Sequence, residues 1–253
     1  MSRPRVGVIV FPGTWSECDF VAGAAVLEWD VSLVWHTETD IDEMDALVLP
    51  GGFAHGDYLR TGAIARFSPA MSVVIERAER GVPVIGSCNG FQILTEAGLL
   101  PGGLMRNDHL EYRCAWQDLR VEATTGPWLS ELTEGEVIRL PISHGEGRFV
   151  ADEATLDHLE SNGLVALRYA EPDGRMTADA NPNGSARAIA GITNPARTIL
   201  GLMPHPERAL EDEVGGTDGL RLLQSLDSWL RAQPAAAERR ALTTADLGRN
   251  GDD

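Results

Sequence analysis

Short apolar runs recur along the first half of the chain and predict buried β-strands. They are four to six residues long, carry no charge and end at turn-forming or polar residues; they are Val6–Phe11, Val31–Trp35, Ala46–Leu49 and Val82–Ile85. Between them lie segments whose apolar residues recur every three or four positions, and Ala63–Arg80 is the clearest predicted helix. Buried strands that alternate with helices are typical of a parallel sheet with helices on both faces.

The second half of the chain has a different pattern. Its strand-like segments are separated only by predicted loops; they are Leu119–Ala123, Val137–Leu140, Val165–Tyr169, Ala188–Ile192 and Ile199–Leu202. A helix is predicted from about Asp218 to Arg231. We therefore predict an α/β fold with a single flavodoxin-like open twisted sheet, parallel in its core and antiparallel in the second half, with helices on both faces. Residues 1–232 form one domain in this prediction, and residues 233–253 form a frayed tail.

Composition excludes several classes of protein. The 253 residues carry a net charge of −17, from 38 acidic and 21 basic residues, and every basic residue is Arg. A protein that tracks phosphates needs a basic face, so no nucleic-acid partner is expected. No apolar run reaches the roughly 18 residues of a membrane helix. Three cysteines cannot all pair, and their spacing matches no metal site, so we expect a cytoplasmic protein without a metal. The Lys-free acidic composition fits salt adaptation and GC-rich codon usage equally well.

The segment Pro83–Gln92 carries the first candidate for chemistry. An apolar strand runs directly into Gly86-Ser-Cys88-Asn-Gly90, and a helical pattern follows, which is the arrangement of a nucleophile elbow with sulfur in place of oxygen. The partial positive charge of a helix N-terminus favours the thiolate over the thiol. The backbone N–H of Asn89 would then point to where an oxyanion forms. The competing interpretation is a structural Cys in a Gly-rich turn.

The second candidate, Met203-Pro-His-Pro-Glu-Arg208, follows the predicted strand Ile199–Leu202. The residue before a proline is extended, so His205 and Glu207 project to the same side of the chain. A base oriented by a carboxylate is the second half of a Cys-His-acid relay. A proline-bounded turn with a surface His is the alternative for this segment alone. Both candidates lie at the carboxyl ends of predicted strands, where open α/β sheets bind ligands.

Two further loops could complete such a site. Gly51-Gly52-Phe53 follows the strand Ala46–Leu49, and N–H groups at Gly52 or Phe53 could stabilise an oxyanion. His55 and Asp57 in the same segment are interpreted as structural or interfacial. The polar loop Ser143–Gly147, which includes His144, could contact a substrate or only turn the chain. Asn181-Pro-Asn-Gly-Ser185 is interpreted as turn chemistry.

These motifs together resemble the class I glutamine amidotransferases. Within that class, Pro50–Arg60, the string Cys88-Asn-Gly-Phe-Gln92, His144–Gly147 and the Asn181 and Met203 segments are similar to the glutaminase subunits of phosphoribosylformylglycinamidine synthase. The resemblance covers about Val6 to Leu230. One segment departs from it: Phe11–Asp19 differs from the Phe-Pro-Gly-Ser-Asn-Cys-Asp string usual in these subunits.

The resemblance implies a reaction, binding residues and partners. Cys88 would attack the carboxamide of L-glutamine, and His205, oriented by Glu207, would transfer the protons. Gly52, Phe53, Asn89, Gln92, Ser143 and His144 would form the oxyanion hole and substrate site. The subunit itself would need no cofactor. ATP and Mg would act on a large synthetase subunit that uses the ammonia, and a small third subunit would bridge the two.

Two alternatives stay open at this point. Another class I glutamine amidotransferase would keep the relay and deliver ammonia to a different acceptor. A non-enzymatic redox sensor could use the same cysteine elbow, but it would not need a matched His-x-Glu pair.

Overall fold

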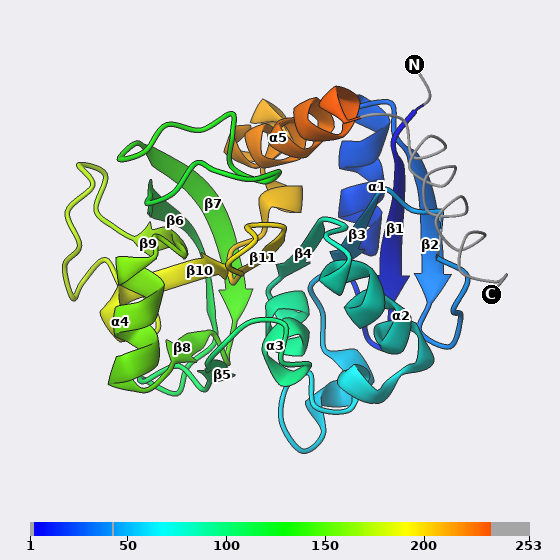
Figure 1. The fold of residues 1–253 in the computed structure, drawn as a ribbon. Helices are drawn as coiled ribbons and strands as arrows, with labels where there is room; N and C mark the ends of the chain where they lie inside the picture. The colour runs from blue at the N-terminus through cyan, green and yellow to red at the C-terminus, as the bar shows by residue number, and fades with distance from the viewer. Residues whose placement is uncertain (1–2, 42, 234–253) are drawn as a thin grey trace, which may run out of the picture.

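The computed structural model describes residues 3–41 and 43–233, which build one nine-stranded sheet and a small two-stranded sheet. The first part of the large sheet is parallel, in the spatial order β2-β1-β3-β4-β11 (Figure 1). These strands are β1 (Arg5–Val10), β2 (Asp30–Trp35), β3 (Ala46–Leu49), β4 (Val84–Ser87) and β11 (Ile199–Leu202). The predicted parallel core is confirmed.

The second part of the large sheet continues from β11 in antiparallel pairs, in the order β10-β9-β6-β7. Its strands are β10 (Ile189–Thr193), β9 (Val165–Tyr169), β6 (Arg113–Val121) and β7 (Val137–His144). The prediction placed Ile199–Leu202 among the antiparallel strands, and this is only half right. That strand is antiparallel to β10 but parallel to β4, so it joins the two parts of the sheet.

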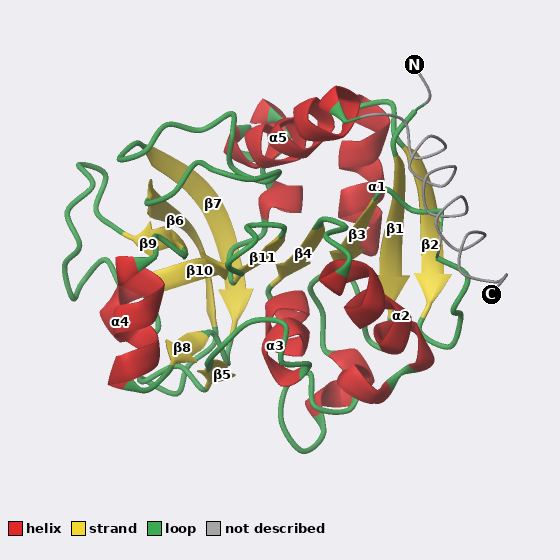
Figure 2. Ribbon diagram, in the orientation of Figure 1, coloured by secondary structure: helices red, strands yellow, loops and turns green. Residues whose placement is uncertain are grey.

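Helices cover both faces of the sheet, as Figure 2 shows. Alternation along β1 explains how: Val6 and Val8 pack in the core beneath α1 (Glu17–Val26) and α5 (Asp218–Ala232). Ile9 belongs instead to the core beneath α2 (Pro69–Glu79) and α3 (Asn89–Glu96). The second core also takes in Leu156 and Leu159 of α4 (Glu153–Ser161), which lies over the antiparallel strands.

Three local predictions need correction. The helix predicted over Ala63–Arg80 begins only at Pro69, since proline has no N–H to give to a preceding turn and suits a first helical position. A region predicted to hold only loops contains α4, which is capped by the Asp152 side chain. A small two-stranded sheet was also not predicted: it pairs β5 (Gly103–Met105), from before β6, with β8 (Arg148–Val150), from just before α4. Single turns of 3₁₀-helix complete the fold, at Ala54–Asp57, Ala65–Phe67, Ala186–Ala188, Pro206–Arg208 and Asp212–Val214.

Two further sequence predictions concern the C-terminal tail and helices that could cross a membrane. The predicted tail lies outside the described residues, apart from Gln233. In the described ranges, no helix has the length and apolar character needed to cross a membrane.

Candidate active site

Cys88 lies at the sharp turn between β4 and α3, as the elbow motif predicts. Its backbone has φ 50° and ψ −107°, a conformation that residues with a Cβ rarely adopt, and it occupies the N-cap position of α3. Its amide donates to the carbonyl of Leu202 at the end of the neighbouring strand β11, at 2.8 Å. The strained turn therefore directs the side chain out of the sheet, at the N-terminus of a helix.

The two glycines of the motif are required by close packing. A Cβ on Gly90 would lie 1.9 Å from the carbonyl oxygen of Leu49, and one on Gly86 would lie 2.6 Å from the carbonyl of Gly90. Both distances are far below a van der Waals contact, so neither position accepts a side chain without movement of backbone. The Gly-x-Cys-x-Gly spacing follows from this crossing of β3, β4 and α3.

His205 and Glu207 form a buried hydrogen-bonded pair beside the elbow. Nδ1 of His205 lies 2.7 Å from Oε1 of Glu207, and the Oγ of Ser87 donates to the same oxygen at 3.1 Å. Both side chains are almost fully buried. Because β4 and β11 are parallel neighbours with Ser87 opposite Leu202, the segments that follow them bring Cys88 and His205 to the same edge of the sheet.

The charges of this group support one another. Burial alone would lower the pKa of His205, but the negative charges of Glu207 and Cys88 outweigh burial and raise that pKa well above its usual value. The negative charges beside its ring thus favour the protonated form of His205. Gly51 leaves room for the ring, since a Cβ there would lie 2.6 Å from Cε1 of His205.

The Gly51-Gly52-Phe53 loop lies beside this pair, and the amides of Gly52 and Phe53 differ in their hydrogen bonding. The Phe53 amide donates to the carbonyl of Gly13 at 2.8 Å, so it is already engaged as the chain stands. Gly52 has φ 154° and pairs with Thr14 in an isolated β-bridge. Of the two donors that the sequence suggests here, the Phe53 amide would first have to break its hydrogen bond to Gly13 to bind an oxyanion.

Asn89 and Gln92 are joined to this loop by their side chains. The Ala54 amide donates to Oδ1 of Asn89 at 3.1 Å, and Nδ2 of Asn89 donates to Oε1 of Gln92 at 2.8 Å. Nε2 of Gln92 then donates to the carbonyl of Glu146 at 2.7 Å. These amides tie the Gly-Gly loop, the helix of the nucleophile and the loop after β7 into one unit.

Ser143 and His144 end β7 next to the elbow. The Sγ of Cys88 lies 3.6 Å from the carbonyl oxygen of Ser143, whose hydroxyl contacts the hydroxyl of Tyr112 at 2.8 Å. His144 is buried, with its ring against Gly147. The six predicted binding residues therefore lie around Cys88 and His205. Most already have protein partners, namely the Phe53 amide and the side chains of Asn89, Gln92, Ser143 and His144.

Sequence reasoning missed two features near the relay. Trp15 packs against the ring of His205 and the guanidinium of Arg208, and Asn107 and Asn183 hydrogen-bond the turn after β7. Contacts between loops so distant in sequence leave no periodic pattern to read. The sequence held one signal that could have pointed to Trp15, since it lies in Phe11–Asp19, which differs from the string usual in the family.

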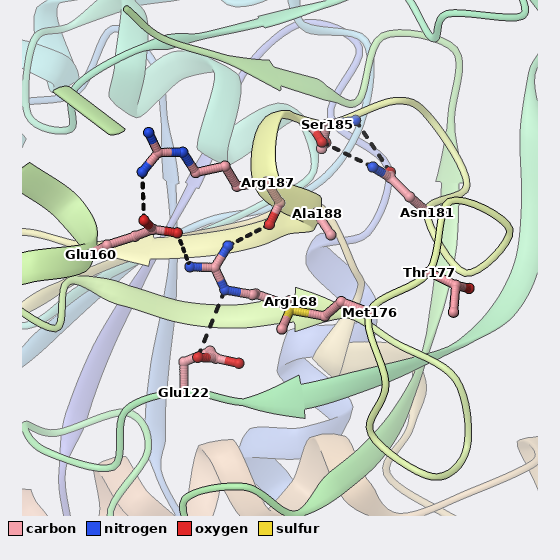
Figure 3. A pocket seen from close by; sticks show the side chains of 9 residues that line it. All are labelled: Glu122, Glu160, Arg168, Met176, Thr177, Asn181, Ser185, Arg187 and Ala188. Atoms are coloured by element: carbon pink, nitrogen blue, oxygen red, sulfur yellow. Dashed lines mark hydrogen bonds and ion pairs between the residues drawn. The ribbon is translucent and has the colours of Figure 1, made fainter. Parts of the chain in front are cut away.

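A cavity of about 490 Å³ lies apart from the relay, among α4, β9, the 3₁₀ turn Ala186–Ala188 and the Asn181–Ser185 loop. Figure 3 shows its centre, where Arg168 contacts Glu160 at 2.6 Å and Glu122 at 3.7 Å, and also donates to the carbonyl of Arg187. Since these groups are paired with one another, the cavity presents a satisfied ion-pair network. In the part of the chain that the structure describes, no group of three or more His, Cys, Asp or Glu side chains is arranged to hold a metal ion.

Comparison with known proteins agrees with this geometry. Residues 3–216 match the CobB/CobQ-like glutamine amidotransferase domain, and the chain belongs to this family. The predicted class of protein is confirmed, and the chain is an enzyme of the glutamine amidotransferase type.

The relatives narrow the class further. Phosphoribosylformylglycinamidine synthase subunit PurQ of Thermomicrobium roseum is 53% identical over 223 residues, which cover 88% of this chain and 94% of the relative. The subunit PurQ of Gloeobacter violaceus is 55% identical over 223 residues, with 88% and 96% covered. A chain in the structure of PurLQS from Thermotoga maritima matches with a TM-score of 0.80 at 38% identity, over 90% of this chain and 100% of that chain. The predicted similarity to the glutaminase subunits of this synthase is confirmed.

Proposed function

We propose that this chain is the glutaminase subunit of a phosphoribosylformylglycinamidine synthase and that Cys88, His205 and Glu207 release ammonia from L-glutamine. The buried hydrogen-bonded pair of His205 and Glu207, held beside a strained Cys88 at a helix N-terminus, is the observation that carries the proposal. Neither a structural cysteine nor a surface histidine needs this arrangement.

Each residue has a definite task in the reaction. The Cys88 thiolate attacks the side-chain carbonyl carbon of glutamine, and the N–H groups of Gly52 and Asn89 stabilise the tetrahedral oxyanion. Protonated His205 gives its proton to the departing ammonia, leaving a γ-glutamyl thioester on Cys88. Neutral His205 then takes a proton from water as that water attacks the thioester. Glutamate leaves, and the thiolate is regenerated.

The released ammonia passes to a partner in this proposal. A large synthetase subunit, which binds ATP and Mg, uses it to amidate formylglycinamide ribonucleotide, and a small subunit bridges the two in the cytoplasm. The relatives, which are named as subunits of one synthase, support the proposed partner subunits. The three cysteines are all unpaired, which supports the proposed cytoplasmic location.

An exposed apolar surface near the site is the proposed docking surface for the synthetase subunit. It consists of Tyr58 and Leu59, which are 74% and 90% exposed and follow the Gly51-Gly52 loop in the chain. Large apolar side chains at such exposure are typical of protein interfaces. Leu59→Glu should weaken co-purification of the synthetase subunit, whereas Leu33→Glu, on the edge strand β2, should leave it intact. Equal retention by both variants would place the partner elsewhere.

The relay is tested by separating ammonia release from ammonia use. In the assembled synthase, Cys88→Ala should abolish glutamine-dependent amidation and leave amidation from added ammonium unchanged, because the thiolate acts only on glutamine. Cys18→Ala and Cys114→Ala are matched controls, since both cysteines are free and exposed. Glutamine-dependent turnover by Cys88→Ala would reject the assignment.

The two alternatives give different results in the same assay. A redox sensor would release no glutamate from glutamine. A glutamine amidotransferase of another pathway would release glutamate but would not support amidation of formylglycinamide ribonucleotide.

A further inference from the structure

Two asparagine side chains, Asn107 and Asn183, are fully buried against the turn formed by His144–Gly147. Asn183 comes from the Asn181–Ser185 loop, which the sequence suggests only turns the chain, and neither residue belongs to the relay. A buried amide without hydrogen-bond partners destabilises the folded chain, so each buried amide is expected to have partners. The partners of Asn183 show what the loop does for the site.

The orientation of the Asn183 amide is fixed by its neighbours. Nδ2 lies 2.9 Å from the carbonyl oxygen of Gly147, which can only accept, and Oδ1 lies 3.0 Å from the amide nitrogen of Ser185, which can only donate. Exchanging oxygen and nitrogen would set two acceptors and two donors against each other. Nδ2 therefore also faces Nε2 of His144, at 3.0 Å, as a donor.

This contact determines the protonation of His144. Since Nε2 must accept a hydrogen bond, the ring proton of the neutral imidazole is on Nδ1. The ring stays neutral because burial, and after it the positive charge of His205, lowers the pKa of His144 to about 3. In the described part of the chain, Nδ1 has no hydrogen-bond partner. His144 is thus a buried neutral donor with a fixed orientation.

The turn that carries His144 is held from three sides. Asn107 donates to the carbonyl of His144 and accepts from the amide of Gly147, both at 3.0 Å. Gln92 binds the carbonyl of Glu146, and Asn183 binds the carbonyl of Gly147. Gly147 has room for nothing larger, because a Cβ there would lie 2.1 Å from the His144 ring.

We propose that Asn183 is a positioning residue for glutamine recognition, which fixes the Nδ1–H tautomer of His144 and seats the His144–Gly147 turn against Cys88. The inference rests on the proposed function, since it concerns the substrate of the same relay. It gives the Asn181–Ser185 loop a part in the reaction although no residue of that loop belongs to the relay.

The tautomer is tested directly by ¹⁵N imidazole NMR of the full chain. Wild-type His144 should show a neutral ring protonated on Nδ1 from pH 5 to pH 8. Asn183→Asp replaces the donor by a carboxylate, so His144 should become protonated on Nε2 and its pKa should rise. The matched control is Asn162→Asp, because Nδ2 of the exposed Asn162 lies 3.2 Å from Nδ1 of the exposed His158. A wild-type His144 protonated on Nε2 would overturn the inference.

The role in recognition is tested by two reagents that modify Cys88. The glutamine analogue 6-diazo-5-oxo-L-norleucine must be recognised before it alkylates the thiolate, whereas iodoacetamide needs only an accessible thiolate. Asn183→Asp should slow labelling by the analogue at least tenfold and change labelling by iodoacetamide less than twofold. Asn162→Asp should match wild type with both reagents.

Each other outcome has one meaning. Equal slowing with both reagents, or no slowing with either, would reduce Asn183 to a structural residue and overturn the inference. If wild type reacts with iodoacetamide but not with the analogue, the proposed function fails instead. Should Asn183→Asp not fold, Asn183→Ala, which also removes the donor, replaces it in the labelling experiment with the same expected result.

Discussion

The indole ring of Trp15 packs against the imidazole of His205, with 6.0 Å between ring centroids and 46° between ring planes. The guanidinium of Arg208 also lies over the indole ring of Trp15, 3.8 Å from the ring centroid. The same indole borders the Gly-Gly loop, since a Cβ on Gly52 would lie 3.1 Å from its Cδ1. Trp15 therefore lies against both His205, the proposed general base, and the Gly51-Gly52 loop, which holds a proposed oxyanion donor.

Removal of this ring should loosen His205 without removing it. Aromatic and cation–π contacts contribute roughly 0.5–1.5 kcal/mol each, which corresponds to about two- to tenfold in rate. We expect Trp15→Ala to lower glutaminase kcat/KM by about that factor and Trp15→Phe to retain most of it. Trp35→Ala, on the edge strand β2, serves as the control in the same steady-state assay. Full activity of Trp15→Ala would show that the ring only fills space.

Glu207 should affect the pH range of the reaction more than its maximum. Its charge helps to raise the pKa of His205, so Glu207→Gln should lower that pKa. The pair of thiolate and protonated His205 would then be lost at lower pH, and the alkaline limb of the pH–rate profile should move toward neutrality. His205→Ala removes the acid and base itself, which typically costs about 10²–10⁴ in rate. An unchanged profile for Glu207→Gln would exclude Glu207 from the relay.

Asp57 should lower stability at neutral pH. Burial, and after it the negative charge of Glu146, raises the pKa of Asp57 from 3.8 to about 6. A folded-state pKa above the unfolded value means that the unfolded chain loses this proton first, so stability falls as pH rises from about 4 to about 6.

Asp57→Asn should therefore have a higher free energy of unfolding than wild type above pH 6, and the difference should vanish near pH 4. Urea unfolding at a series of pH values measures this, with Asp212→Asn as an exposed control. A constant difference across the series would contradict the raised pKa.

The net charge of −17 predicts a dependence of stability on salt. Self-repulsion weakens as the Debye length falls from about 10 Å at 0.1 M to about 3 Å at 1 M salt. The melting temperature should therefore rise with potassium chloride if the carboxylates are an adaptation to salt. A midpoint that stays flat into molar salt would favour codon usage as the origin of the Lys-free composition.

The parallel half of the fold and the relay could be predicted because their signals are local. An apolar strand followed at once by Gly-x-Cys-x-Gly leaves little choice of conformation at Cys88, and two prolines fix the geometry of His205 and Glu207. The same local logic would have found α4, since Asp152 accepts from the Thr155 amide as an N-cap.

The contacts that hold the His144–Gly147 turn in place could not be predicted in this way. Asn107 and Asn183 reach the turn from loops on either side of it in sequence, and nothing in either loop alone states which backbone groups it will bind. Likewise, the engagement of the Phe53 amide by Gly13 depends on how two loops meet. Such contacts are decided by tertiary packing, which leaves no periodicity in the chain.

Strand β11 joins the parallel and antiparallel parts of the sheet, and residues with different proposed roles come from the two parts. The residues proposed for bond making follow β4 and β11, which are adjacent parallel strands, whereas the His144–Gly147 turn and its asparagine partners come from the antiparallel part. With the roles proposed above, changes in the antiparallel part would alter which amide is accepted while Cys88 and His205 keep their alignment. Substrate choice could then diversify on one side of a strand while the chemistry on the other side is conserved.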